Sequence, residues 1–273
     1  MNRGSAAAIL VLALCAPAIG APAPAAAVPE LSGTFIRIGD LWFNAVEDDQ
    51  EGKPIDRLDV DSPDAEEIWA GDFENPILQP WAREIVKNNA ESEMRLQHVY
   101  TADDSCWPSG VPQAVNLLDE VQFLQTKDRV TILYRRDHQV RRVWLNAAHS
   151  ANPKPSWYGE SIGHYEGDTL VIDTIGLKTH RMSVVDAFGT PHTESLHVVE
   201  RYRPYPTPFG KRLEVIVRVE DPGTFTGPWK GMAEYQQDKT VERLDEMVCA
   251  ENNRDFADGS TFGPIPQEDT PQF

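Results

Sequence analysis

The second half of the chain is a succession of short β-like segments, and this feature most constrains the fold. Runs rich in β-branched and aromatic residues follow one another from Val121 onward, with no helical segment between them. The clearest hairpin turns at 165–168, where Gly167 tolerates positive φ and Asp168 can hydrogen-bond its own backbone. The expected strands are 121–126, 128–136, 138–146, 161–165, 169–176, 195–203, 211–220, 228–237 and 241–249.

These segments predict an all-β fold. Eight or nine strands without intervening helices form an antiparallel meander, which avoids open edges by closing or by folding into two layers. We expect an antiparallel lipocalin-like barrel, with a β-sandwich as the second choice. The expected organisation is a signal peptide at 1–27, an N-terminal strand, acidic loop and helical cap at 28–120, the barrel core at 121–252 and a flexible tail at 253–273.

The cap is expected to contain one strand and one helix. Residues 31–38 have the composition of an opening strand. Residues 76–89 form the best helical segment, because a proline stands near its start and Leu78, Trp81 and Ile85 recur on one face. This face is expected to pack over one end or side of the sheet.

The first 27 residues have the features of a secretory signal. Arg3 supplies a charged start, residues 6–14 are apolar but too short to span a bilayer, and small residues offer cleavage after Gly20 or Ala27. Nothing later in the sequence is long and apolar enough for a transmembrane helix. The sequence therefore predicts a protein that is periplasmic or secreted, without membrane insertion.

The charge of the chain bears on its partners. The net charge of −18 becomes −19 when the signal, with its Arg3, is removed. Such an acidic surface repels phosphate backbones and argues against nucleic acid, whereas a neutral or cationic small molecule is favoured. Residues 47–74 carry much of this charge, and 59–64 resemble a calcium loop only loosely, so a solvated acidic loop is the preferred interpretation. The oligomeric state stays open.

The number of cysteines agrees with an exported protein. Cys15 lies in the signal, and the remaining Cys106 and Cys249 form an even pair that predicts a disulfide in an oxidising compartment. Closing so long a loop contributes up to ~5 kcal/mol in the chain-entropy model. Two distant cysteines supply too few ligands for zinc.

His138 is the first candidate for proton transfer. Along its strand, His138 shares a face with Ile132, Tyr134 and Trp144, and the alternation of the strand points it into the barrel. A buried imidazole suits general acid–base catalysis. The alternative is a structural histidine, hydrogen-bonded to a neighbouring strand.

Four further residues complete the predicted catalytic set. Asp173 lies opposite Ile162 across the hairpin, and the pattern does not decide which face it occupies. His197 and Glu200 fall on opposite faces of the next strand, and Glu200 has the more apolar face. His192 lies in the loop before that strand, where it could close over a barrel mouth.

Other chemistries have weaker support. The residues 159–163 match the nucleophile motif G-x-S-x-G, but they run into a hairpin strand instead of a strand-to-helix turn. No spacing of histidines and carboxylates matches a metal motif, and no glycine-rich nucleotide fingerprint occurs, so no metal or other cofactor is expected. The aromatic residues Tyr134, Trp144 and Trp157 are the expected substrate contacts.

Six motifs resemble a widespread, uncharacterised family of exported bacterial all-β proteins. They are His138-Gln139-Val140-Arg141-Arg142, Pro155-Ser156-Trp157, the segment from Glu166 to Thr174 (EGDTLVIDT), Pro191-His192-Thr193, Leu196-His197-Val198-Val199-Glu200-Arg201 and the segment from Cys249 to Arg254 (CAENNR). The resemblance covers about residues 75–255 and implies export and a β fold. The family carries Arg or Lys in place of His164, which argues against a shared catalytic role for this residue.

Three functions remain at this point. The first is an exported, cofactor-independent enzyme of the lyase, isomerase or cyclase type, acting by acid–base chemistry on a small, partly apolar hydroxylated or aromatic substrate in a barrel cavity. The second is a lipocalin-like carrier for a small hydrophobic ligand. The third is a structural module whose barrel is filled by side chains. The enzyme is slightly preferred.

Overall fold

A computed structural model describes residues 28–47, 50–65, 68–97, 99 and 101–249. The predicted signal peptide and flexible tail lie outside this part of the chain. Within it, strands dominate and one α-helix occurs. The strands are β1 (Gly33–Ile38), β2 (Asn44–Ala45), β3 (Val121–Gln125), β4 (Arg129–Tyr134), β5 (Val140–Leu145), β6 (Glu160–Glu166), β7 (Thr169–Ile175), β8 (His197–Thr207), β9 (Gly210–Glu220) and β10 (Trp229–Gln237), and the helices are α1 (Pro80–Met94) and the short 3₁₀ helices η2 (Gln113–Asn116) and η3 (Arg136–His138).

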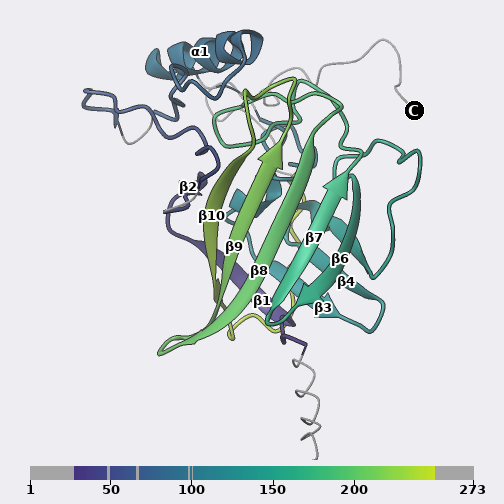
Figure 1. The fold of residues 1–273 in the computed structure, drawn as a ribbon. Helices are drawn as coiled ribbons and strands as arrows, with labels where there is room; N and C mark the ends of the chain where they lie inside the picture. Colours follow the sequence, from purple (N-terminus) through teal and green to yellow (C-terminus); the bar gives the residue numbers. More distant parts are fainter. Residues whose placement is uncertain (1–27, 48–49, 66–67, 98, 100, 250–273) are drawn as a thin grey trace, which may run out of the picture.

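The sheet closes into a barrel, which confirms the first choice of fold. β1 pairs with β3 on one side and with β10 on the other, so β1 and β3 to β10 form a ring of nine strands (Figure 1). The short strand β2 adds to the edge of β10 outside the ring. Because β1 lies in the segment assigned to the cap, the barrel begins at Gly33 and not at residue 121.

One pair of neighbouring strands departs from the predicted antiparallel meander. β5 and β6 run parallel, with Trp144 opposite Ile162. Parallel neighbours need a connection that returns the chain to the starting end of the sheet. Residues 146–159 make this return, and the prolines at 153 and 155 within them do not belong to a strand.

The alternation of side chains builds the barrel interior as expected. On β9, Leu213, Val215, Val217 and Val219 are fully buried, while the residues between them are partly exposed. The β6–β7 hairpin has the predicted register, with Ile162 opposite Asp173. The residues of the turn at Gly167 were therefore enough to predict how β6 and β7 pair.

Helix α1 lies beyond one end of the barrel, away from the tip of the long β8–β9 hairpin (Figure 1). Pro80 occupies its first turn, as predicted. The predicted apolar face is wrong for Trp81 and Ile85, which are exposed, whereas the third predicted residue, Leu78, is buried just before the helix. The buried residues of the helix itself are Ala82, Val86, Ala90 and Glu93. Small side chains on the buried face let the helix approach the loops beneath it closely.

The end of the described chain is held by a disulfide and not by a strand. Residues 241–249, expected as the last strand, form no strand. Cys249 is bonded to Cys106 with a Cα–Cα distance of 5.4 Å, which confirms the predicted pair. A disulfide suits an oxidising, non-cytoplasmic compartment. Within the described residues, no helix has the length and apolarity needed to cross a membrane.

Candidate functional site

His138 does not point into the barrel. It is exposed, and it ends the 3₁₀ helix η3 in the connection between β4 and β5. Asp137 and His138 both have positive φ, at 50° each. The prediction of an inward catalytic imidazole at this position is therefore wrong.

The error has a simple geometric cause. Residues 130, 132 and 134 of β4 do face inward, as predicted. The turn at η3 then resets the alternation, so that Arg141 and Val143 of β5 face inward and Trp144 is 44% exposed. Side chains alternate between the two faces only within one continuous strand. A turn that adds residues between two strands breaks this alternation.

Arg141 and Glu200 instead form a buried ion pair inside the barrel. Arg141 is 1% exposed and Glu200 is fully buried. Arg141 Nη1 donates to Glu200 Oε1 at 2.9 Å, and Nη2 donates to the other carboxylate oxygen. The hydroxyl of Tyr202 donates to the same carboxylate at 2.9 Å. The prediction that Glu200 faces inward is thus confirmed.

The remaining polar atoms of this pair are also hydrogen-bonded. Arg141 Nε donates to Ser161 Oγ at 3.1 Å, and Nη2 donates to Thr174 Oγ1 at 2.9 Å. Burial favours the neutral form of Arg141, but the Glu200 carboxylate outweighs it and raises the pKa of the guanidinium. Burial raises the pKa of the nearby Tyr134 to about 12. Arg141 therefore stays charged and Tyr134 stays neutral at neutral pH, which suits a structural network.

Asp173 lies on the outer face of the barrel with two histidines. Its Oδ1 atom is 2.9 Å from Nε2 of His149 and 2.9 Å from Nε2 of His197. The other ring nitrogen of His149 lies 3.1 Å from Glu160 Oε1. Two predicted residues, Asp173 and His197, therefore meet each other, but they meet outside the barrel and away from Glu200.

His192 is buried beside Ser183. Its Nδ1 donates to the Thr193 carbonyl at 2.9 Å, so Nε2 is free to accept from Ser183 Oγ at 2.8 Å. Burial lowers the pKa of His192 and keeps it neutral. Ser183 and His192 are 3% and 4% exposed, so a substrate has no access to this pair.

The predicted substrate contacts are dispersed as well. Tyr134 faces the barrel interior and stacks on Tyr158, with ring centroids 5.4 Å apart. Trp157 lies in the loop before β6 and packs against Trp107 and His180. With Trp144 outside the barrel, the three predicted residues line no common space.

A large cavity lies elsewhere, at the end of the barrel that α1 covers. Its volume is about 690 Å³, within the range of small-molecule sites. Helix α1, residues 99 and 101–118 before β3, and the loop 181–191 between β7 and β8 supply most of its lining, and Leu41, Trp69 and Arg136 add to it. Asn89 of α1 joins two of these walls, because its side-chain amide donates to the carbonyls of Phe188 and Gly189. We call this space the mouth pocket.

The walls of the mouth pocket combine apolar and acidic groups. The apolar side chains are Leu41, Trp69, Ile85, Val99, Leu117, Leu118, Met182, Val184, Ala187, Phe188 and Pro191. The charged side chains are Glu93, Asp103, Asp104, Arg136 and Arg181. Arg136 Nε already donates to Asp119 at 2.6 Å, so the balance of the pocket is acidic.

Two amide side chains of the mouth pocket have buried polar atoms without a hydrogen-bond partner among the described residues. Asn116 is 4% exposed, and neither its Nδ2 nor its Oδ1 has a partner in the described structure. Gln113 Oε1 is also buried without a hydrogen-bond partner in the described structure. Both residues belong to η2, where positions i and i+3 eclipse and thus share one side. Burying one polar group without a partner costs about 1–3 kcal/mol.

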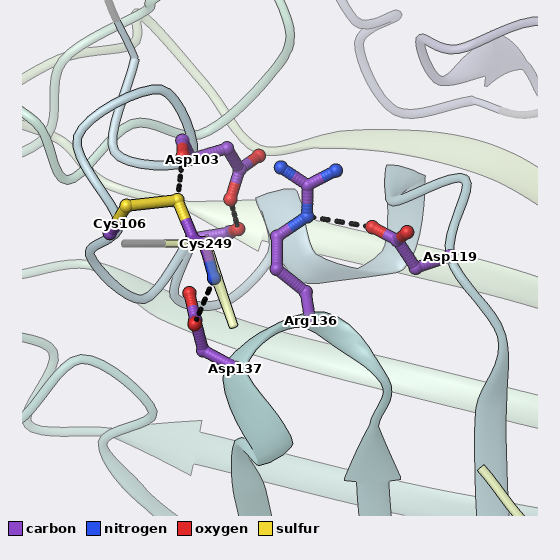
Figure 2. The surroundings of a disulfide bond; sticks show 7 residues. Asp103, Cys106, Asp119, Arg136, Asp137 and Cys249 are labelled. Atoms are coloured by element: carbon purple, nitrogen blue, oxygen red, sulfur yellow. Dashed lines mark hydrogen bonds and ion pairs between the residues drawn. A yellow bond between two sulfur atoms is a disulfide. The ribbon is translucent and has the colours of Figure 1, made fainter. Parts of the chain in front are cut away.

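Asp103 is a carboxyl of the mouth pocket whose pKa is raised. Burial raises its pKa, against the opposing effects of the Ser109 hydroxyl, which donates to it, and of Arg136. The disulfide holds this part of the wall, since Cys249 Sγ lies 3.6 Å from the Asp103 carbonyl oxygen (Figure 2). The Cys249 amide donates to Asp137 Oδ1 at 2.9 Å, which ties the same wall to the β4–β5 connection.

None of the eight predicted catalytic and substrate-binding residues lines the mouth pocket. The sequence does hold a signal for the residues that line it: at 111–118 (VPQAVNLL), Gln113 and Asn116 are polar amides embedded in an otherwise apolar loop segment. Such a pattern indicates polar groups that will be buried. In the described part of the chain, no group of three or more His, Cys, Asp or Glu residues is arranged to hold a metal ion.

Comparisons with family models, with curated proteins and with solved structures give no match to this chain. The resemblance drawn from the six motifs therefore stays a prediction. Any assignment of function has to be argued from the geometry of the site.

Proposed function

We propose that the chain is an exported protein that binds a small, partly apolar molecule in the mouth pocket. The disulfide between Cys106 and Cys249 supports an oxidising, periplasmic or extracellular location. The observation that carries the proposal is the pair of amide side chains, Gln113 and Asn116, whose buried polar atoms have no partner beside a cavity of about 690 Å³. A bound molecule would satisfy those atoms.

The barrel interior is filled by side chains, which supports a binding site at the mouth of the barrel. In a lipocalin-like carrier the ligand occupies the barrel itself. Here the interior holds the Arg141–Glu200 pair and closely packed rings, such as Phe123 against Phe35 and Tyr202. The barrel thus acts as a rigid support, and binding occurs in loops placed on it.

A blocking substitution tests the proposal. Ala187 lines the mouth pocket and is half-buried, so Ala187→Trp would fill the space that a ligand needs. Ala148 is exposed and lies outside the pocket, so Ala148→Trp is the matched control. We expect neutral compounds from a thermal-shift screen to stabilise the wild type and Ala148→Trp but not Ala187→Trp. A screen that yields no binder, or binders that stabilise all three equally, would refute the proposal.

Acid–base catalysis in the same pocket is the second candidate. Asp103 favours it, because burial in the cavity wall raises the pKa of this carboxyl and so makes it a better proton donor and acceptor than an exposed aspartate. This second proposal assigns the proton transfer to Asp103 instead of His138, which is exposed outside the barrel. If a ligand is converted, Asp103→Asn should lower turnover by ~10²-fold or more while the ligand still binds. Unchanged turnover in that variant would leave binding as the function.

A further inference from the structure

The two amides of η2 carry information about the chemistry of the ligand. Asn116 presents one donor, Nδ2, and one acceptor, Oδ1, side by side in one plane. Both atoms are buried and without a partner in the described residues. The complementary group has an acceptor beside an N–H donor, as in a carboxamide, a lactam or the edge of an amino-substituted heterocycle.

Gln113 adds a second requirement. Its Oε1 is a further buried acceptor on the same side of η2 as Asn116. A second N–H on the ligand would satisfy it. A primary carboxamide or an aminoheterocycle supplies one acceptor and two N–H groups, and therefore satisfies all three atoms at once.

The charges of the mouth pocket exclude the closest alternative, a carboxylate. Three carboxyl-bearing residues line the pocket, Glu93, Asp103 and Asp104. Of the two arginines, Arg136 is already engaged by Asp119. A carboxylate has two acceptors and no donor, so it would also leave Asn116 Oδ1 and Gln113 Oε1 unpaired.

The apolar walls define the rest of the ligand. Trp69 and Phe188 line the pocket, and Trp42 packs against both rings, with centroid distances of 6.3 and 6.1 Å. Rings held in this way offer flat surfaces for an aromatic body. A planar, uncharged molecule with one polar edge fits such a space.

We infer that the mouth pocket recognises a neutral, planar, aromatic ligand through an amide-type edge that pairs with Asn116 and Gln113. This inference rests on the proposed binding function and adds the chemical class of the ligand. Recognition depends on matched hydrogen bonds, because a site built around buried polar groups rejects an analogue that leaves them unpaired.

Three probes of one shape test the class. 2-Naphthamide carries the amide edge, methyl 2-naphthyl ketone replaces its NH₂ by CH₃, and 2-naphthoate replaces it by a charged oxygen. Calorimetric titration of the full mature chain should give an affinity for the amide about 10-fold or more above that for the ketone or the carboxylate, the scale of one or two net hydrogen bonds.

Variants link the preference to the named residues. Asn116→Leu keeps the side-chain shape and removes both polar atoms, so it should bind amide and ketone equally. It should also melt at or above the temperature of the wild type without ligand, because two unpaired buried atoms are gone. Gln113→Met should weaken amide binding alone. Asn152→Leu, at an exposed position outside the pocket, is the control and should keep the preference.

The outcomes separate the two proposals. If the amide and the ketone bind the wild type equally, or if Asn116→Leu keeps the preference, the amide-edge inference fails while the binding function stands. The same holds if none of the three probes binds but other compounds do. A melting temperature clearly lowered by Asn116→Leu would show that Asn116 is structural and would overturn the inference. No binding of any compound would remove the proposed function itself.

Discussion

The Arg141–Glu200 pair inside the barrel and the two amides at the mouth pocket differ in how their buried polar atoms are hydrogen-bonded. Inside the barrel, the Arg141–Glu200 pair is surrounded by hydroxyl groups, and its donors and acceptors are matched. At the mouth, Asn116 and Gln113 keep buried polar atoms without partners in the described structure. The Arg141–Glu200 pair is matched within the protein, whereas the amide atoms at the mouth stay available to a further group.

This difference separates support from recognition. A buried polar network that is fully hydrogen-bonded rigidifies a core. We propose that the unpartnered amide atoms beside the cavity mark a place where another molecule binds. Substitutions in the two regions should therefore have opposite effects. Those in the barrel should change stability, and those at the mouth should change binding.

Breaking the barrel pair should have the largest effect. Glu200→Leu leaves the Arg141 guanidinium buried and unpaired, so the free energy of unfolding should fall by about 3–5 kcal/mol. Urea denaturation measures this. The double variant Arg141→Met with Glu200→Leu removes both charges and should recover most of the loss. If the single variant were as stable as the wild type, the network would not be the support described.

Removing the disulfide should have a smaller effect on stability and a further effect on binding. The bond joins residues 143 positions apart, and its loss through Cys106→Ser should cost about 2–4 kcal/mol. Because Cys249 contacts the Asp103 backbone, the same change should weaken ligand binding. Denaturation and titration of the reduced and oxidised wild type provide the comparison, and equal affinities would contradict the link to the pocket.

The burial of Asp103 should make the stability of the protein depend on pH. Its folded-state pKa is raised, so the wild type loses stability as the pH rises from the unfolded value near 4 through the folded value. Asp103→Asn cannot ionise, and its stability relative to the wild type should therefore rise over that range and then level off. Urea midpoints between pH 3 and 8 measure this difference.

Asp128 gives a control of opposite sign. The Thr126 hydroxyl, which donates to it, lowers the pKa of Asp128. Its stabilising effect is present above the unfolded pKa and is lost as the pH falls through the folded one. Asp128→Asn should thus lose stability relative to the wild type as the pH rises. Parallel curves for the two variants would contradict the assigned burial of Asp103.

His138 should matter least. It is exposed in a turn and has positive φ, which asparagine tolerates well. His138→Asn should change the free energy of unfolding by less than about 0.5 kcal/mol and leave ligand binding unchanged. A loss of binding or of turnover in this variant would restore the sequence-based mechanism.

The sequence predicted what depends on local pattern. Strand alternation and the Gly167 turn were enough for the closed barrel, the register of Ile162 against Asp173 and the inward face of Glu200. The cysteine pair followed from counting. Each of these features is decided within one strand, one turn or one residue type.

The candidate site was not predictable in the same way. The face of β5 depends on how many residues the η3 turn adds, which no periodicity records. The mouth pocket is built from segments far apart in the sequence, and α1 turns Ala82 and Val86 inward instead of the larger Trp81. The apolar segment around Gln113 and Asn116 hints that these amides are buried, but it does not show that they lie beside a cavity without hydrogen-bond partners.

The most direct test of the account is a crystal structure of the mature chain soaked with 2-naphthamide. We predict electron density for the probe in the mouth pocket, with its carboxamide at hydrogen-bond distance, roughly 2.7–3.2 Å, from both amide atoms of Asn116. A pocket that stays free of the probe, with ordered water molecules completing the hydrogen bonds of Asn116 and Gln113, would contradict the central claim.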